Sequence, residues 1–92
     1  MLSLEFGAEG TGSSHAYIGI NLPIGKTNKE LLVDLAIELD EMQKHLYGTH
    51  VYINGRITTH MAMSLGHVLS HVCKSISLFD PKENEYYLVI KH

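Results

Sequence analysis

The stretch that decides the fold is THVYINGRITTHMAMSLGHVLSHVCKSISLFDP, residues 49–81. Alternating apolar residues over 49–53 and again over 75–79 are typical of two strands, and the apolar period between them is typical of a helix. A strand, a helix and a strand in this order form a right-handed crossover, which makes the two strands parallel. The stretch therefore predicts a β-α-β unit.

The helix predicted within this unit sorts its side chains into two faces. One face carries an apolar stripe suited to a core: Met61, Leu65, Val68, Leu69 and Val72. Residues seven and eleven positions apart return to nearly the same side of a helix, which places His60, His67 and His71 in one line on the other face. We expect this helix to run to about Val72.

The N-terminal part of the chain predicts a β-hairpin. Apolar residues alternate over 2–6 and again over 16–22, and both runs have the period of half-buried strands. They are joined by the glycine- and serine-rich segment GAEGTGSS, residues 7–14. This segment lacks the Gly-Lys-Ser/Thr ending of a P-loop and no helix follows it directly, so we interpret it as a flexible hairpin tip.

A second amphipathic helix is predicted between the hairpin and the β-α-β unit. Thr27 and Glu30 form a capping box at its start, and Gly48 marks its end. Its apolar stripe consists of Leu31, Leu32, Leu35, Leu39, Met42 and Leu46. We interpret its acidic outer face as a solvated surface without function. Turn residues over 80–84 then lead into a last strand over 86–90, paired antiparallel with the strand before it.

The predicted order is therefore β-β-α-β-α-β-β in a single compact α/β domain, with a mixed sheet, two helices and the size of a ferredoxin-like fold. The formal net charge of −3 over 92 residues excludes broad binding of long duplex nucleic acid, which needs a basic surface. Cys73 is alone, so no intrachain disulfide forms, and we expect a cytoplasmic location. We expect no signal peptide and no membrane span.

The carboxyl ends of the two parallel strands should form a binding edge. Arg56 follows the first strand and Asp80 ends the second, and ligands of open α/β sheets bind at this edge. The free amides at the start of the helix attract anions there, and a guanidinium suits a phosphate. The predicted phosphate-binding residues are Gly55, Arg56, Thr58 and Thr59, and either threonine can cap the helix. The alternative is that Gly55 only turns the chain and Arg56 only makes a surface contact.

The helix histidines are candidates for metal binding or acid–base catalysis. His67 and His71 are four residues apart, the spacing at which two imidazoles of one helix share a metal. Asp80 is the carboxylate to consider beside them, and His60 is a further candidate near the phosphate-binding edge. The alternative is a solvated histidine face, or one that packs against a partner chain.

Geometry separates these candidates into two groups. His60 and His71 lie about 16 Å apart along the helix, and Asp80 belongs at the His60 end. One chain therefore offers Arg56, His60 and Asp80 at one place and His67 with His71 at another. If His71 and Asp80 act on one ligand, two subunits must contribute. This predicts an oligomer with a composite site.

Four features follow one another at characteristic spacings: VYINGR at 51–56, a helix with His67 and His71, ISLFDP at 76–81 and YLVI at 87–90. Residues 49–90 with this pattern resemble the smallest CRISPR-associated ring nucleases, those of the Csx-three type, which have a compact relative of the CARF fold. The N-terminal half of the chain resembles this family only in outline. Members of that family usually follow Gly-Arg with Gly-Pro and a tryptophan, whereas residues 57–60 here are Ile-Thr-Thr-His.

The resemblance implies a defined activity. Such enzymes linearise cyclic tetra-adenylate, the second messenger of type III CRISPR antiviral defence, and they were first described as manganese-dependent RNA deadenylases. They sandwich the ring between subunits, so the resemblance implies a homodimer that assembles to a homotetramer around the ligand. By position, His71 and Asp80 match the catalytic histidine and aspartate, with His60 as a third catalytic candidate. The implied Mn²⁺ ligands are His67, His71 and Asp80.

Two other functions stay open at this point. A binding module would sense a cyclic oligoadenylate through Arg56 and the helix terminus without cutting it. A histidine-faced oligomerisation module would use the helix histidines only for contact with another subunit.

Overall fold

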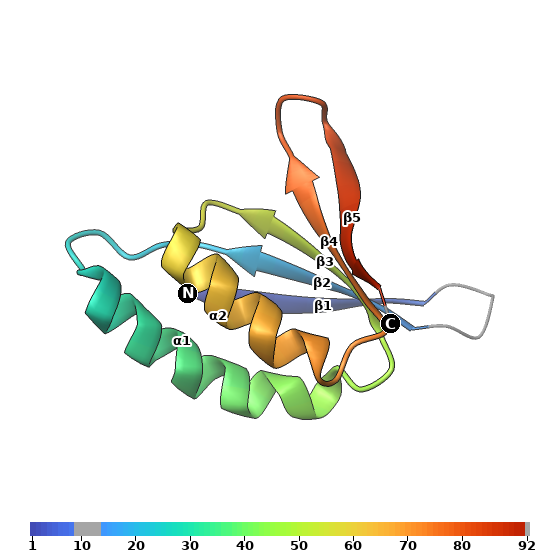
Figure 1. Ribbon diagram of the computed structural model, residues 1–92, viewed down its shortest axis with the longest axis horizontal. Coiled ribbons are helices and arrows are strands. Elements are labelled where there is room, and N and C mark those ends of the chain that lie inside the picture. Colours follow the sequence, from blue (N-terminus) through green and yellow to red (C-terminus); the bar gives the residue numbers. More distant parts are fainter. Residues whose placement is uncertain (9–13, 92) are drawn as a thin grey trace.

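Five strands form one mixed sheet in the order β1-β2-β3-β4-β5 (Figure 1). The computed structural model describes residues 1–8 and 14–91. The elements are β1 (Leu2–Ala8), β2 (Ser14–Ile20), α1 (Asn28–Met42), the 3-10 turn η1 (Gln43–His45), β3 (His50–Gly55), α2 (Thr59–Ser70), β4 (Ser75–Asp80) and β5 (Glu85–Lys91). The predicted order of strands and helices is confirmed. The predicted flexible hairpin tip falls largely in residues 9–13, outside the described residues.

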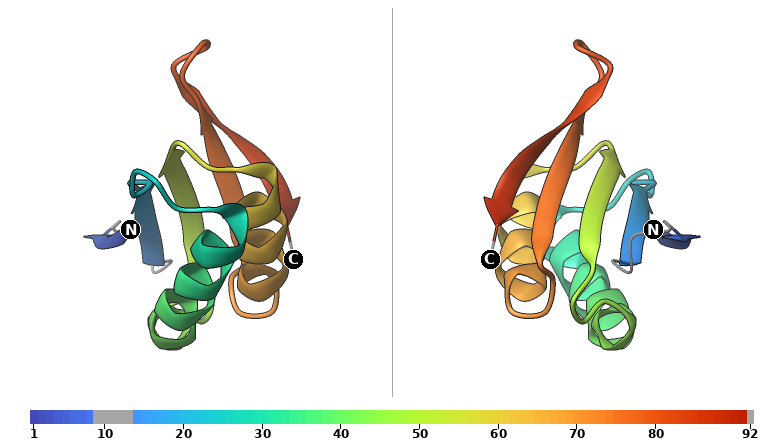
Figure 2. Two further views of the ribbon diagram at one scale, coloured as in Figure 1. Left: turned by 90° about the vertical axis from the view of Figure 1, so that its left-hand side faces the viewer. Right: turned by 90° about the vertical axis from the view of Figure 1, so that its right-hand side faces the viewer.

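The strand pairing explains where the helices lie. β1 and β2 are antiparallel, β2–β3 and β3–β4 are parallel, and β4 and β5 are antiparallel. The connections β2-α1-β3 and β3-α2-β4 each move the chain by one strand, and both move it in the same direction across the sheet. Because such connections are right-handed, α1 and α2 lie on the same face of the sheet. Figure 2 shows both helices on one face of the sheet, and in the described part of the chain no helix covers the opposite face.

The core fills the space between the helices and this inner face. Alternate residues of the central strands point inward and pack on one apolar stripe from each helix. The buried residues from these elements are Ala16, Ile18, Ile20, Leu31, Leu35, Leu39, Val51, Ile53, Met61, Leu65, Leu69 and Ile76. Burial of each large aliphatic side chain contributes about 1.5–3 kcal/mol, so this single layer accounts for most of the driving force.

The start of α1 follows the prediction and its end does not. Thr27 and Glu30 form the complete capping box, and the hydrogen bonds from Thr27 hold the pKa of Glu30 below its ordinary value. However, α1 ends at Met42 and continues as η1, so the prediction that Gly48 ends the helix is wrong. Gly48 has φ +71° and instead turns the chain into β3.

The acidic face of α1 is not only a solvated surface. The Glu38 carboxylate accepts a hydrogen bond from the Leu2 amide at 2.9 Å, and it lies 3.5 Å from the amino group of Met1. Glu38 therefore ties β1 to the helix layer.

The ends of β3 and α2 also differ slightly from the prediction. β3 runs to Gly55, so this glycine is the last residue of the strand rather than part of a turn. Thr58 is the cap of α2, because its hydroxyl oxygen accepts a hydrogen bond from the Met61 amide at 3.2 Å. α2 ends at Ser70 instead of Val72, because the His71 amide bonds three residues back and tightens the last turn.

Candidate functional site

Gly55 closes β3 in a conformation that only glycine tolerates. Its φ is +125°, and a Cβ atom at this position would lie 2.3 Å from the carbonyl oxygen of Ile20 on the neighbouring strand. The glycine is therefore required for packing of β3 against β2, whatever it also does for a ligand. Arg56 follows at the edge of the sheet, exposed, and forms no ion pair within residues 1–8 and 14–91.

The first turn of α2 begins beside Arg56. The amides of Thr59 and His60 have no acceptor among the residues that the structure describes, as is usual for the first turn of a helix. A shallow hollow of about 560 Å³ opens here, lined by Leu32, Thr59, His60, Met63 and Ser64. Free amides, the positive end of the helix dipole and a guanidinium together favour an anionic group at this corner.

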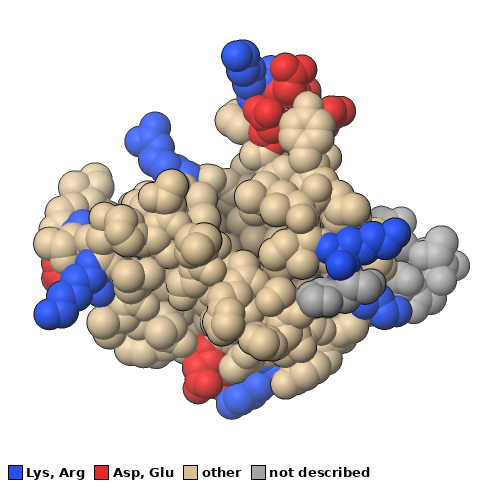
Figure 3. Space-filling view, viewed as in Figure 1, with Lys and Arg blue, Asp and Glu red and all other residues tan. Residues whose placement is uncertain are grey.

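Asp80 ends β4 and shapes the turn that follows. Its Oδ1 atom accepts hydrogen bonds from the amides of Lys82 at 2.9 Å and Glu83 at 3.4 Å. The β4–β5 hairpin projects beyond the rest of the sheet (Figure 1), and at its tip Asp and Glu side chains gather beside one basic side chain (Figure 3). The charged residues of this tip are Asp80, Lys82, Glu83 and Glu85, so acidic groups outnumber basic ones. A phosphate near this tip would meet negative charge, which a metal cation or a nearby arginine has to offset.

The other end of α2 carries the histidine pair. The rings of His67 and His71 meet edge to face with their centroids 4.9 Å apart. Both side chains are exposed, His67 in the last turn and His71 directly after the last helical residue. The negative end of the helix dipole favours a cation at this position.

The structure brings some predicted residues together and leaves others apart. His67 and His71 are adjacent, and Arg56 lies at the start of the same helix. Asp80 lies at the far end of β4, about 16 Å from Ser75, where the strand begins near His71. Among the described residues no three His, Cys, Asp or Glu side chains lie close enough to hold a metal ion. One chain by itself therefore does not assemble the predicted set of His67, His71 and Asp80.

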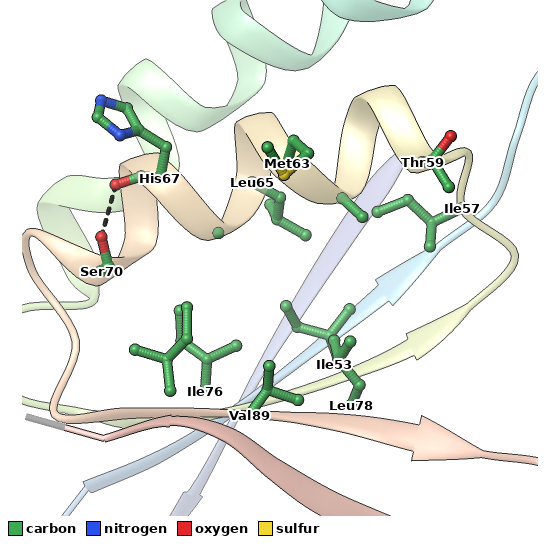
Figure 4. A pocket seen from close by; sticks show the side chains of 13 residues that line it. Ile53, Ile57, Thr59, Met63, Leu65, His67, Ser70, Ile76, Leu78 and Val89 are labelled. Atoms are coloured by element: carbon green, nitrogen blue, oxygen red, sulfur yellow. Dashed lines mark hydrogen bonds between the residues drawn. The ribbon is translucent and has the colours of Figure 1, made fainter.

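A groove of about 740 Å³ runs between α2 and the β4–β5 hairpin (Figure 4). Its lining is mostly aliphatic and includes Ile53, Ile57, Leu65, Ile76, Leu78 and Val89. Figure 4 shows the His67 ring pointing away from this groove, while Ser70 Oγ donates a hydrogen bond to the His67 carbonyl at 2.8 Å. The groove was not predicted, because it depends on how far the hairpin extends past α2.

Six further rings lie on the face of the sheet that the helices leave open, and the sequence analysis did not single them out. They are His15, Tyr17, His50, Tyr52, Phe79 and Tyr86. The signal available in the sequence was their place at the outward positions of four strands. The thiol of Cys73, in contrast, is buried, which raises its pKa and argues against a role as a nucleophile.

Searches of protein-family models, curated proteins and solved structures found no match to this chain. The resemblance to ring nucleases therefore remains a prediction from short motifs. In the described ranges, no helix is both long enough and apolar enough to cross a membrane.

Proposed function

We propose that this chain is a metal-dependent phosphodiesterase that linearises cyclic tetra-adenylate and thereby switches off type III CRISPR signalling. The arrangement of β3, α2 and β4 carries the proposal. It combines an anion-binding corner at Arg56 with an exposed pair of histidines at the opposite end of the same helix. A ring with phosphates on several sides can contact both kinds of site when two subunits enclose it.

Phosphate binding is assigned to the corner at the start of α2. The guanidinium of Arg56 offers a planar fork of donors, and the free amides of Thr59 and His60 point from the helix terminus. Thr58 contributes by fixing the helix start, since its hydroxyl oxygen is already engaged by the Met61 amide. Gly55 contributes through the path of the backbone.

The cleavage step is assigned to His71 as general base. It removes the proton from a ribose 2′-hydroxyl, and the 2′-oxygen then forms a bond to the adjacent phosphorus while the bond from phosphorus to the 5′-oxygen breaks. The leaving 5′-oxygen takes up a proton, for which His60 of the partner subunit is the proposed donor, because His60 and His71 of one chain lie at opposite ends of α2. The product is a linear chain with a 2′,3′-cyclic phosphate at one end and a 5′-hydroxyl at the other.

The proposed manganese site spans two subunits. Its proposed ligands are His67 and His71, whose imidazoles are neighbours, and Asp80, which belongs to the other edge of the sheet. His71 is either the general base or a metal ligand, because an imidazole bound to the metal does not also take a proton. The ligand set is incomplete in one chain and needs Asp80 from a second copy. A bound Mn²⁺ would neutralise negative charge on the scissile phosphate. The proposed assembly is a homodimer that pairs into a homotetramer around the ring.

A sensor that binds the ring without cutting it is the second candidate. It is favoured by the hydrogen bonds at Asp80, because Oδ1 already accepts two backbone amides and holds the hairpin turn. On this view Arg56 and the helix terminus bind phosphate, and Asp80 has a structural role only.

The deciding experiment incubates the purified chain with cyclic tetra-adenylate, with and without Mn²⁺, and separates cyclic from linear products by chromatography. The enzyme proposal expects linear product that disappears in His71→Ala. The matched control is His45→Ala, which removes another exposed histidine in η1, outside the β3–α2–β4 unit. Tight binding of a ring that stays intact would support the sensor and contradict the enzyme. Absence of binding to any cyclic oligoadenylate would contradict both proposals. In that case an oligomer that dissociates in His71→Ala would point to the oligomerisation module.

A further inference from the structure

The face of the sheet opposite the helices is ordered in three rows that cross the strands. The pairing register defines a histidine row of Gly7, His15, His50, Ser75 and Lys91. Next to it lies a tyrosine row of Glu5, Tyr17, Tyr52, Ser77 and Leu88. The third row, here called the hollow row, joins two printed sets of partners, Ser3–Gly19–Asn54 and Phe79–Tyr86, which follow the last β3–β4 pair, Ile53–Leu78, on either strand. These residues alternate with the core residues, so burial of the core does not explain them.

The rings of this face pack against one another in one continuous cluster. The ring of Tyr52 on β3 lies nearly parallel to the rings of two residues of β2. The centroid distance is 5.5 Å to His15 and 5.1 Å to Tyr17. Tyr86 meets Tyr52 edge to face at 5.3 Å. Tyr17 remains 38% exposed. Aromatic rings on an open sheet, backed by helices on the other face, are the arrangement on which RNA-binding sheets stack unpaired bases.

A hollow of about 230 Å³ adjoins these rings. It is lined by Ser3, Glu5, Tyr17, Ile18, Gly19, Asn54 and Tyr86. A Cβ atom on residue 19 would lie 2.7 Å from Ser3 Oγ, so a side chain at this position would crowd the hollow. The hollow thus combines ring surfaces with a hydroxyl, an amide and a carboxylate, which are groups that hydrogen-bond the edges of a nucleobase.

The histidine row supplies the groups that suit phosphates. Lys91 on β5 carries a positive charge at one end of this row, His50 lies two strands away on β3 and His15 three strands away on β2. His50 Nδ1 lies 2.7 Å from Ser75 Oγ. The carboxylate on this face, Glu5, belongs to the tyrosine row. Four residues separate Gly19 from His15, or about 13 Å along β2. Stacked bases of one strand are spaced by roughly 3.4 Å, so a ligand that reaches both rows is several nucleotides long.

We propose that this open face binds a short single-stranded oligonucleotide, with one base in the hollow beside Tyr17 and Tyr86 and its phosphates along the histidine row. The hollow lies near the edge that carries Arg56, because Asn54 lines it, but its ring residues belong to the face that the helices leave open. The proposal does not rest on the proposed nuclease activity. A second copy of the chain fits this face less well. Two faces packed together would bury Glu5 and Lys91 of both copies, and charges are costly to remove from water.

The test is fluorescence anisotropy of a labelled six-nucleotide single-stranded RNA titrated with the full chain. Tyr86→Ala should weaken binding by about tenfold or more, as expected for loss of one base–ring stack. The matched control is Tyr87→Ala, which removes the next ring of β5, on the opposite side of the strand, and should bind as the original chain does. Tyr86→Phe should retain binding. Lys91→Gln should lower the slope of log affinity against log salt by about one phosphate contact.

Gly19→Ala offers a gentler test if Tyr86→Ala does not fold, because its Cβ meets only the end of the Ser3 side chain. It should also weaken binding. Equal affinities of Tyr86→Ala and Tyr87→Ala, or no binding of the RNA, would overturn the proposal. So would binding that is lost in Arg56→Gln and kept in Tyr86→Ala, since this places the RNA at the edge of the sheet. A dimer that dissociates in Tyr86→Ala without any RNA binding would assign the face to self-association.

Discussion

The junction between β3 and α2 is fixed by close backbone packing and a helix cap, whereas the C-terminal end of α2 presents two exposed rings. Gly55 is required because of Ile20, and Thr58 because it caps the helix. His67 and His71 contact each other, and their rings form no hydrogen bond within the ranges 1–8 and 14–91. The comparison teaches that a residue in a functional motif can be explained by folding alone. The functional proposal therefore rests on Arg56, His67 and His71 more than on Gly55 or Thr58.

The largest expected effect is the loss of ring cleavage in His71→Ala. Removal of a general base lowers the rate by about 10²–10⁴-fold. The free energy of unfolding should change by no more than about 0.5 kcal/mol, because the side chain is exposed. Cleavage assays and urea unfolding of the same preparation measure both quantities. A marked loss of stability in His71→Ala with unchanged cleavage would show that His71 serves folding and not catalysis.

The next effect is on stability, at the end of β3 that leads into α2. Gly55→Ala should destabilise the fold by about 3 kcal/mol, because it combines a strained positive φ with a Cβ atom that collides with the Ile20 carbonyl. Gly25→Ala is the matched control. Its φ of +82° is also positive, but nothing lies within 4 Å of the added Cβ. Equal losses for the two variants in urea unfolding would remove the packing explanation for Gly55.

Arg56→Gln should separate binding from folding at that same end. Loss of a charge-assisted hydrogen bond to phosphate should weaken binding of cyclic tetra-adenylate by about tenfold or more, with little change in stability. Arg56→Lys should recover only part of the affinity, since an ammonium lacks the planar fork. Isothermal titration calorimetry on the original chain, Arg56→Lys and Arg56→Gln checks that affinity falls in this order. Unchanged affinity in Arg56→Gln would leave Arg56 as a surface residue.

The smallest expected effect is that of Thr58→Ala, about 1 kcal/mol of stability through loss of the helix cap. Thr58→Ser keeps the hydroxyl and should retain most of the stability in thermal unfolding. If Thr58→Ala leaves stability intact and abolishes ligand binding, its hydroxyl serves the ligand and not the helix.

The parts of this fold that follow local rules were predictable. Alternation, helical period and crossover handedness predict that β3 and β4 are parallel, and hence that Arg56 and Asp80 lie at one edge. The capping box at Thr27 is equally local. The end of α1 was not predictable from Gly48, because the chain tightens into η1 before it reaches that glycine.

The open face escaped prediction because it depends on register between distant strands. Tyr17 and Tyr52 become neighbours only when β2 pairs in parallel with β3, and Tyr86 joins them through the β4–β5 hairpin. The hydrogen bonds at Asp80 Oδ1 likewise depend on the path of the turn, although the turn itself was predicted. Sites that are formed by the pairing of distant strands are therefore the hardest to predict from sequence patterns alone.

The central claim is that His71 and Asp80 act on one ring from two different subunits. The most direct measurement mixes His71→Ala protein with Asp80→Ala protein and follows cleavage of cyclic tetra-adenylate in the presence of Mn²⁺. The account predicts that each variant alone is inactive and that the mixture recovers part of the activity, because some composite sites then contain both intact residues. Two folded variants that remain inactive when mixed would contradict it.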